Sequence, residues 1–238
     1  MVVFNSWYSI MLSLQSIVSI RELLTLVMAY FLLVTIAGTF KAWVAKMVGD
    51  DTPEQMGFLT FNPLVHTSPI GFAFLLIFKF GWGKHIPINP YNITGRFRAF
   101  KLMMAYLSDS FANFAMAVAS LLFLFIYFGP KVLAVFFYKS FASLFPEASS
   151  FAISLGLIVS ALIYLNIILA SLNFIISGFS FILTMFSDRF TIFGRYRDII
   201  IILIPMFAIL FFIRYLEAFT FGLVSSVSIL IARIFGIL

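Results

Sequence analysis

The strongest constraint on the fold comes from two long stretches without a charged residue. The first runs over 18 residues from Leu23 to Phe40, and the second over 40 residues from Ala148 to Ser187. As a helix rising about 1.5 Å per residue, the first crosses a hydrocarbon core of roughly 30 Å, whereas the second is about twice too long and is predicted to break. We expect Ala148–Ala170 to be a full span and the remainder a broken or re-entrant return. The residues that favour this position for the break are Asn166, Asn173, Ser177 and Gly178.

The composition supports the same class and removes several kinds of chemistry. Of the 238 residues, 63% are hydrophobic and only 10% are charged, which is typical of an all-α integral membrane protein. The absence of cysteine excludes disulfides, thiolate nucleophiles and cysteine-based metal sites. The net charge of +6 is attributed to basic residues at membrane edges. We therefore expect the lipid bilayer and other transmembrane proteins as partners, and no nucleic acid.

Further segments extend this prediction to a polytopic bundle. Pro69–Phe78 has only ten apolar residues, which predicts either a thinned crossing or a re-entrant element buried in protein. Ser110–Pro130 and Ile199–Ile213 are further predicted spans, and a weaker helix follows Glu217. We predict one membrane domain over residues 1–238 with about five to six membrane segments, some of them re-entrant or broken, in a bacterial inner membrane or an organellar membrane.

The ends of these segments predict the orientation of the chain. The basic loop Lys84–Lys101 is expected on the cytoplasmic side, and the charged cluster Asp188–Asp198 on the same side. A short amphipathic piece over residues 131–147 is expected on the opposite side. Residues 1–20 lack the features of a cleaved signal peptide and are expected to be a retained interfacial segment.

One region, residues 49–90, concentrates polar residues beside these apolar segments, where each polar group needs a partner. The order Gly49-Asp50, Thr52, Gly57, Leu59-Thr60, Asn62-Pro63 and His66 resembles GDxTxxxxGxLTxNPxxHxDP of short site-2 proteases, intramembrane zinc metalloproteases without a PDZ insert. The run from Phe80 to Pro90 resembles the family's FGWAKPVPVNP. Two asparagines further along fit the family's AGPxxN and NLxPxxPLDG elements. The matching residues are Gly49, Asp50, Asn62, Pro63, His66, Gly81, Trp82, Lys84, Pro87, Asn89, Pro90, Asn113 and Asn173.

The groups that perform the chemistry of this family are missing. Its HExxH helix holds zinc through two histidines and activates the bound water through the glutamate. Counting back from Gly49, this motif falls on residues 37–41, where Ala37, Gly38 and Lys41 replace the three functional residues. Phe181 stands where the resemblance places the third zinc ligand, and Ser68 replaces the aspartate of HxDP. The resemblance therefore implies a degenerate member without catalytic residues, bound metal or cofactor.

Four ionisable residues leave alternatives open. His66 is expected to hydrogen-bond backbone in the NPxxH turn, and His85 to lie at the membrane interface, since two histidines are too few for a zinc site. Asp109 is expected to cap a helix N-terminus, with proton carriage or substrate binding as the alternative. Lys41 is expected to extend toward the interface, and otherwise to occupy the former metal position facing an acid.

These observations favour a catalytically inactive, site-2-protease-like protein that acts by binding. Its expected role is an accessory or scaffold subunit of a membrane complex, or a binder of transmembrane clients. One alternative is an atypical intramembrane metalloprotease that uses His66 and His85. The other is a small transporter or proton-conducting subunit that uses Asp109.

Overall fold

The computed structural model describes residues 20–79, 81–132 and 144–186, together with the isolated residues 222, 226, 229, 230 and 233. This part of the chain is helical, and its only bridge between extended residues joins Thr67 to Gly83. The helices are α2 (Ile20–Val48), α3 (Thr52–Gln55), α4 (Pro63–His66), α5 (Pro69–Phe78), α6 (Arg98–Phe128) and α8 (Ser150–Phe186).

Three of these helices are long and apolar enough to cross a membrane, namely Leu23–Val48 of α2, Arg98–Phe128 and Ser150–Phe186. The chain therefore fits the predicted class of α-helical membrane protein, with three candidate spans among the described residues. The predicted interfacial segment 1–20, apart from Ile20, the cluster 188–198 and the span 199–213 lie outside the described residues. The predicted helix after Glu217 and the amphipathic piece 131–147 are described only at scattered positions.

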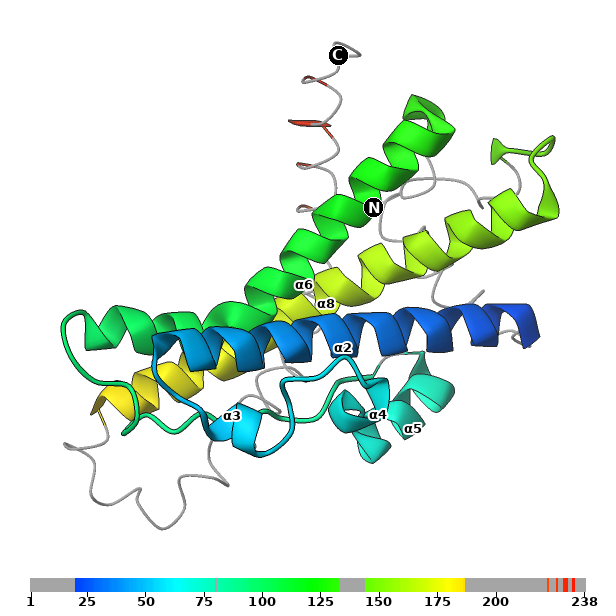
Figure 1. Cartoon of the computed structure of the whole chain (residues 1–238). Coiled ribbons are helices and arrows are strands. Elements are labelled where there is room, and N and C mark those ends of the chain that lie inside the picture. The colour runs from blue at the N-terminus through cyan, green and yellow to red at the C-terminus, as the bar shows by residue number, and fades with distance from the viewer. Residues whose placement is uncertain are drawn as a thin grey trace.

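The long helices α2, α6 and α8 pack along one another and form the core (Figure 1). Helices α6 and α8 run in opposite directions, and Tyr106 Oη of α6 lies 3.1 Å from Thr184 Oγ1 near the end of α8. One apolar cluster joins α6 to α8 through residues such as Leu121 and Ile163. A second joins α2 to α8 and to Leu75 of α5. The described core is thus a three-helix bundle with short helices attached to α2.

The predicted break in the second half of the 148–187 stretch is wrong, because α8 is one helix of 37 residues. Its polar side chains bind carbonyl oxygens one turn earlier. The Asn166 Nδ2 group donates to the Leu162 carbonyl at 2.8 Å, and the Ser180 hydroxyl donates to the Ile176 carbonyl at 2.8 Å. Such bonds satisfy polar groups without interrupting the helix. At about 55 Å, α8 exceeds the hydrocarbon core and must tilt or project beyond it.

The segment Pro69–Phe78 forms one short helix, α5. Its ten residues extend about 15 Å, roughly half of a hydrocarbon core. It lies beside α2 (Figure 1), and its Leu75 is fully buried. A Cβ atom added to Gly71 would lie 2.0 Å from the Trp82 carbonyl oxygen, so only glycine allows the returning chain to pass here. The Tyr30 hydroxyl donates to the same carbonyl oxygen at 2.9 Å.

Asp50 joins the two sequence blocks of the 49–90 region. It follows the end of α2 and is fully buried. Its Oδ2 atom accepts a hydrogen bond from the Asn89 backbone at 2.8 Å, and its Oδ1 atom accepts one from Asn92 Nδ2 at 2.9 Å. A buried carboxylate requires such donors. The bonds hold the returning segment against the end of α2 and so fix the path of residues 81–92.

Candidate functional site

Lys41 lies where the three long helices meet. Only 3% of the residue is exposed, and its Nζ atom lies 2.8 Å from Asp109 Oδ2 of α6. The same ammonium group donates to the Ser177 hydroxyl of α8 at 3.3 Å. The expected extension of Lys41 toward the membrane interface is therefore wrong. Its side chain faces an acid instead, because an ammonium group inside a bundle is stabilised only when a counter-ion and hydrogen-bond acceptors reach it.

Asp109 is the counter-ion and not a helix cap. Helix α6 begins at Arg98, and Phe97 is its N-cap residue, so Asp109 lies well inside the helix. The Ser108-Asp109-Ser110 sequence resembles a cap, but the helix starts eleven residues earlier. The Asp109 side chain is 15% exposed. Its carboxylate has its cationic partner on α2, and this ion pair carries no net charge into the bundle.

His66 is buried beside α2, with 1% of the residue exposed. Its Nε2 atom lies 2.8 Å from the Thr60 carbonyl oxygen and 3.3 Å from Thr39 Oγ1. The predicted hydrogen bond from His66 to a backbone group is confirmed, but its acceptor is Thr60, which precedes the NPxxH turn. Burial lowers the pKa of His66, and the bond to the Thr60 carbonyl acts in the opposite direction. Since a carbonyl oxygen can only accept, Nε2 carries the hydrogen of this bond, and Nδ1 has no hydrogen-bond partner among the described residues.

Gly38 makes room for the His66 ring. A Cβ atom added to Gly38 would lie 2.3 Å from His66 Nδ1, a distance that no real contact allows. Ala37, the preceding residue, is 5% exposed and belongs to the core. The positions at which the resemblance places a histidine, a glutamate and a second histidine are thus filled by the packing of Ala37, the contact of Gly38 with His66, and the ion pair of Lys41.

The structure also places the other residues that the sequence resemblance singled out. Ser68 caps α5, because its hydroxyl accepts a hydrogen bond from the Gly71 backbone at 3.2 Å. Asn113 is 1% exposed and lies inside α6, not at a helix start, while Asn173 is half-buried in α8. Phe181 packs against the cluster that contains Val48. The α8 side chain beside Lys41 is Ser177, one turn before Phe181.

The segment from Gly81 to Pro90 passes beside His66. The Lys84 backbone donates to the His66 carbonyl at 2.6 Å, and the Lys84 ammonium lies 5.6 Å from the centre of the Phe58 ring. His85 keeps an exposed surface. Desolvation by the surrounding chain and the charge of Lys41 nevertheless lower the pKa of His85, while the charge of Asp109 raises it.

The sequence argument missed one member of this site and the pairing of two others. Ser177 was treated only as a breakpoint, and Asp109 was assigned to a cap rather than to Lys41. A usable signal exists, because Lys41 and Asp109 each stand alone beside an apolar stretch, and isolated opposite charges in membrane helices tend to pair. Among residues 20–79, 81–132 and 144–186, no three His, Asp or Glu side chains come together as a metal-binding group.

Comparison with known proteins gives one limited similarity. A 48-residue segment is 46% identical to the protein named "Putative zinc metalloprotease YwhC" from Bacillus subtilis (strain 168). The match covers 20% of this chain, which spans only 22% of that relative. No protein-family model matches the chain. No solved structure matches it either. The similarity agrees with a site-2-protease-like origin at a coarse level only.

The buried ion pair makes a prediction about stability. Replacing Lys41 by Met leaves the Asp109 carboxylate inside the bundle without a partner, which costs about 3–5 kcal/mol. We expect Lys41→Met to lower the midpoint of thermal unfolding in detergent strongly, and Lys41→Met/Asp109→Leu to recover part of the loss. Lys46→Met is the control, because Lys46 forms an exposed pair with Glu54 at 2.6 Å and its loss should matter little. Unchanged unfolding of Lys41→Met would contradict the pairing.

The contact between Gly38 and His66 makes a second prediction. Gly38→Ala places a methyl group 2.3 Å from His66 Nδ1, so the ring must move, and we expect its bond to Thr60 to weaken. We expect a loss of about 1–3 kcal/mol, measured as a lower midpoint of thermal unfolding. Gly178→Ala is the matched control in α8, because its added Cβ meets only Leu107 Cδ2 at 3.9 Å. Equal stability of the two variants would show that His66 does not occupy this space.

Proposed function

We propose that this chain is a catalytically inactive, site-2-protease-like membrane protein that acts by binding other transmembrane proteins. The observation that carries the proposal is the ion pair between Lys41 Nζ and Asp109 Oδ2. By the sequence resemblance, Lys41 occupies the place of the second zinc-binding histidine. A protonated amine offers no lone pair to a metal and repels a divalent cation, so a site centred on this pair does not hold zinc.

The arrangement of His66 supports the same proposal. A glutamate that activates a zinc-bound water needs a side chain at position 38, and the His66 ring fills that space. The imidazole is committed to the Thr60 carbonyl through Nε2. Its other nitrogen faces the glycine. At the position where the family activates water, Gly38 packs against His66 and stabilises α2 against residues 60–66. At the position of a metal-binding histidine, Lys41 forms the ion pair with Asp109.

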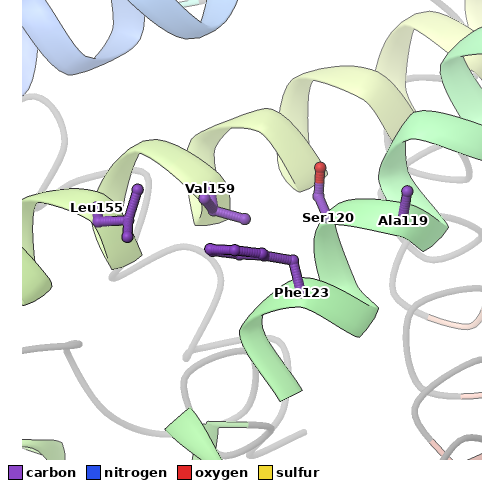
Figure 2. A pocket seen from close by; sticks show the side chains of 5 residues that line it. All are labelled: Ala119, Ser120, Phe123, Leu155 and Val159. Atoms are coloured by element: carbon purple, nitrogen blue, oxygen red, sulfur yellow. The ribbon is translucent and has the colours of Figure 1, made fainter. Parts of the chain in front are cut away.

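The outer surface supports binding as the retained activity. On α2, large apolar side chains recur about every fourth residue and are 37–65% exposed: Leu24, Met28, Leu32, Ile36, Phe40, Trp43 and Met47. A shallow groove of about 330 Å³ lies between α6 and α8. Figure 2 shows the Phe123 ring of α6 pointing toward Val159 of α8 within it. Faces of this kind suit lateral packing of a transmembrane helix as well as lipid.

Site-specific photo-crosslinking in native membranes tests the binding role. A photoreactive phenylalanine at Ile36 probes the α2 face, and one at Phe123 probes the groove. Leu33 is the matched control, because it lies on α2 but is only 1% exposed. We expect a discrete protein adduct from at least one exposed position and none from Leu33. Adducts with lipid alone at both exposed positions would contradict a scaffold or client-binding role.

The zinc content of the purified chain and its activity on a transmembrane peptide test the alternative of an atypical metalloprotease. The proposal requires much less than one zinc ion per chain and no cleavage of a transmembrane peptide. Stoichiometric zinc with cleavage would overturn it. Loss of that cleavage in a folded His66→Ala variant would then assign the metal to the histidines.

A second candidate function is proton conduction or small-solute transport through Asp109. The observation that favours it is an ionisable side chain, 15% exposed, inside a candidate span. This function requires that Asp109→Asn abolish proton flux in proteoliposomes while the crosslinked adduct remains. Glu54→Gln, at an exposed acid, is the control and should leave the flux unchanged. Equal flux in Asp109→Asn and the unaltered chain would exclude this candidate.

A further inference from the structure

The start of α6 carries an exposed surface that combines cations with aromatic rings. We call it the Arg96 surface, and it consists of Tyr91, Arg96, Phe97, Phe100 and the half-buried Lys101, whose ammonium donates to the Thr94 carbonyl at 3.3 Å. Its three aromatic residues are 76%, 67% and 56% exposed in chain order, and Arg96 is also exposed. The Arg96 guanidinium lies 4.9 Å from the centre of the Phe97 ring. Exposed aromatic rings beside a cation are typical of an interaction surface.

The loop that presents this surface is fixed by its own contacts. The Arg98 Nε group donates to the Ile93 carbonyl at 3.0 Å, and its Nη2 group donates to the Pro90 carbonyl at 3.1 Å. Ile93 is fully buried in the cluster with Val48 and Leu102. These contacts tie the loop to the end of α2. The Arg96 surface is therefore displayed on a fixed support.

Phe97 adopts a backbone conformation that a bulky residue rarely adopts. Its φ is 63°, in the left-handed region. The ring gains little from the chain in return, because 67% of the residue stays exposed. The contact that the structure gives this ring is the Arg96 guanidinium at 4.9 Å, so the loop turns an aromatic ring and a cation outward together.

The place of the surface and its charge identify its partner. Candidate spans end at Val48 of α2 and begin at Arg98 of α6, and these two ends lie side by side (Figure 1), so the surface lies at one membrane boundary. Between Glu54 and Asp109 the sequence contains no acidic residue and five lysines and arginines. Aromatic rings favour the headgroup layer, and arginine and lysine favour anionic phosphates. We propose that the Arg96 surface binds the anionic phospholipids of that leaflet selectively.

Energy transfer to labelled lipids tests this selectivity. The chain has no cysteine, so Ala99→Cys, an exposed position beside the surface, accepts a single donor dye. The labelled chain is placed in nanodiscs of mixed phosphatidylcholine and phosphatidylglycerol that carry a trace of acceptor-labelled lipid of either kind. We expect phosphatidylglycerol to be enriched near the dye about threefold or more, since each basic residue at an anionic surface contributes roughly a fivefold preference.

Variants of the labelled chain identify the residues responsible. Arg96→Gln/Lys101→Gln should reduce the enrichment to near onefold, and 0.5 M NaCl should weaken it. Lys46→Gln is the control, because its ammonium already pairs with Glu54 at 2.6 Å, and it should keep the enrichment. Equal transfer to both lipids in the unaltered chain would overturn the proposal and point to an acidic protein partner instead. Enrichment that persists in the double variant would also overturn it, because other cations would then be responsible.

Discussion

The ion pair between Lys41 and Asp109 is the interaction on which the described bundle depends most. Neither charge is tolerable alone in an apolar helical interior, since an unpaired buried ion costs several kcal/mol. The pair removes this cost only when α2 and α6 bring the two side chains within hydrogen-bonding distance, here 2.8 Å. The Ser177 hydroxyl adds a contact from α8. One side chain of α2 thus contacts both neighbouring helices.

The polar region after α2 is built to keep buried polar groups paired. Asp50 receives donors from Asn89 and Asn92, and His66 pairs with the Thr60 carbonyl. Gly71 of α5 leaves room for the backbone of Trp82 to pass closely. Each of these residues matches or borders the motif that resembles site-2 proteases. Their contacts are internal to the chain, so these residues have a structural role here.

The sequence predicted the spans far better than it predicted the contacts between them. The apolar stretch from Leu23 to Phe40 lies within α2, and His66 bonds to a backbone carbonyl as predicted, although the acceptor, Thr60, precedes the predicted turn. Both predictions rest on composition and short-range geometry. The break in α8 failed because serine and asparagine can bind carbonyls one turn earlier, a choice that the sequence pattern leaves open.

The site was harder to predict because its central contact joins residues 68 positions apart. Local patterns assigned Asp109 to a cap and Lys41 to the interface, and each assignment is reasonable for an isolated helix. Only the packing of α2 on α6 decides between them. The same packing determines that Ser177, rather than Phe181, faces Lys41. Chain distance, and not the chemistry of the residues, limited the prediction.

In the proposed interpretation, the ammonium group of Lys41 replaces the structural contribution of a metal ion but not its chemistry. A bound zinc ion joins ligands from several helices and also lowers the pKa of its water. The Lys41 ammonium likewise joins α2, α6 and α8, with acceptors from Asp109 and Ser177. It has no open coordination position and cannot polarise a water as a Lewis acid does. A bundle stabilised in this way keeps its outer helix faces in place after the reaction centre is lost, and those faces are what a binding protein requires.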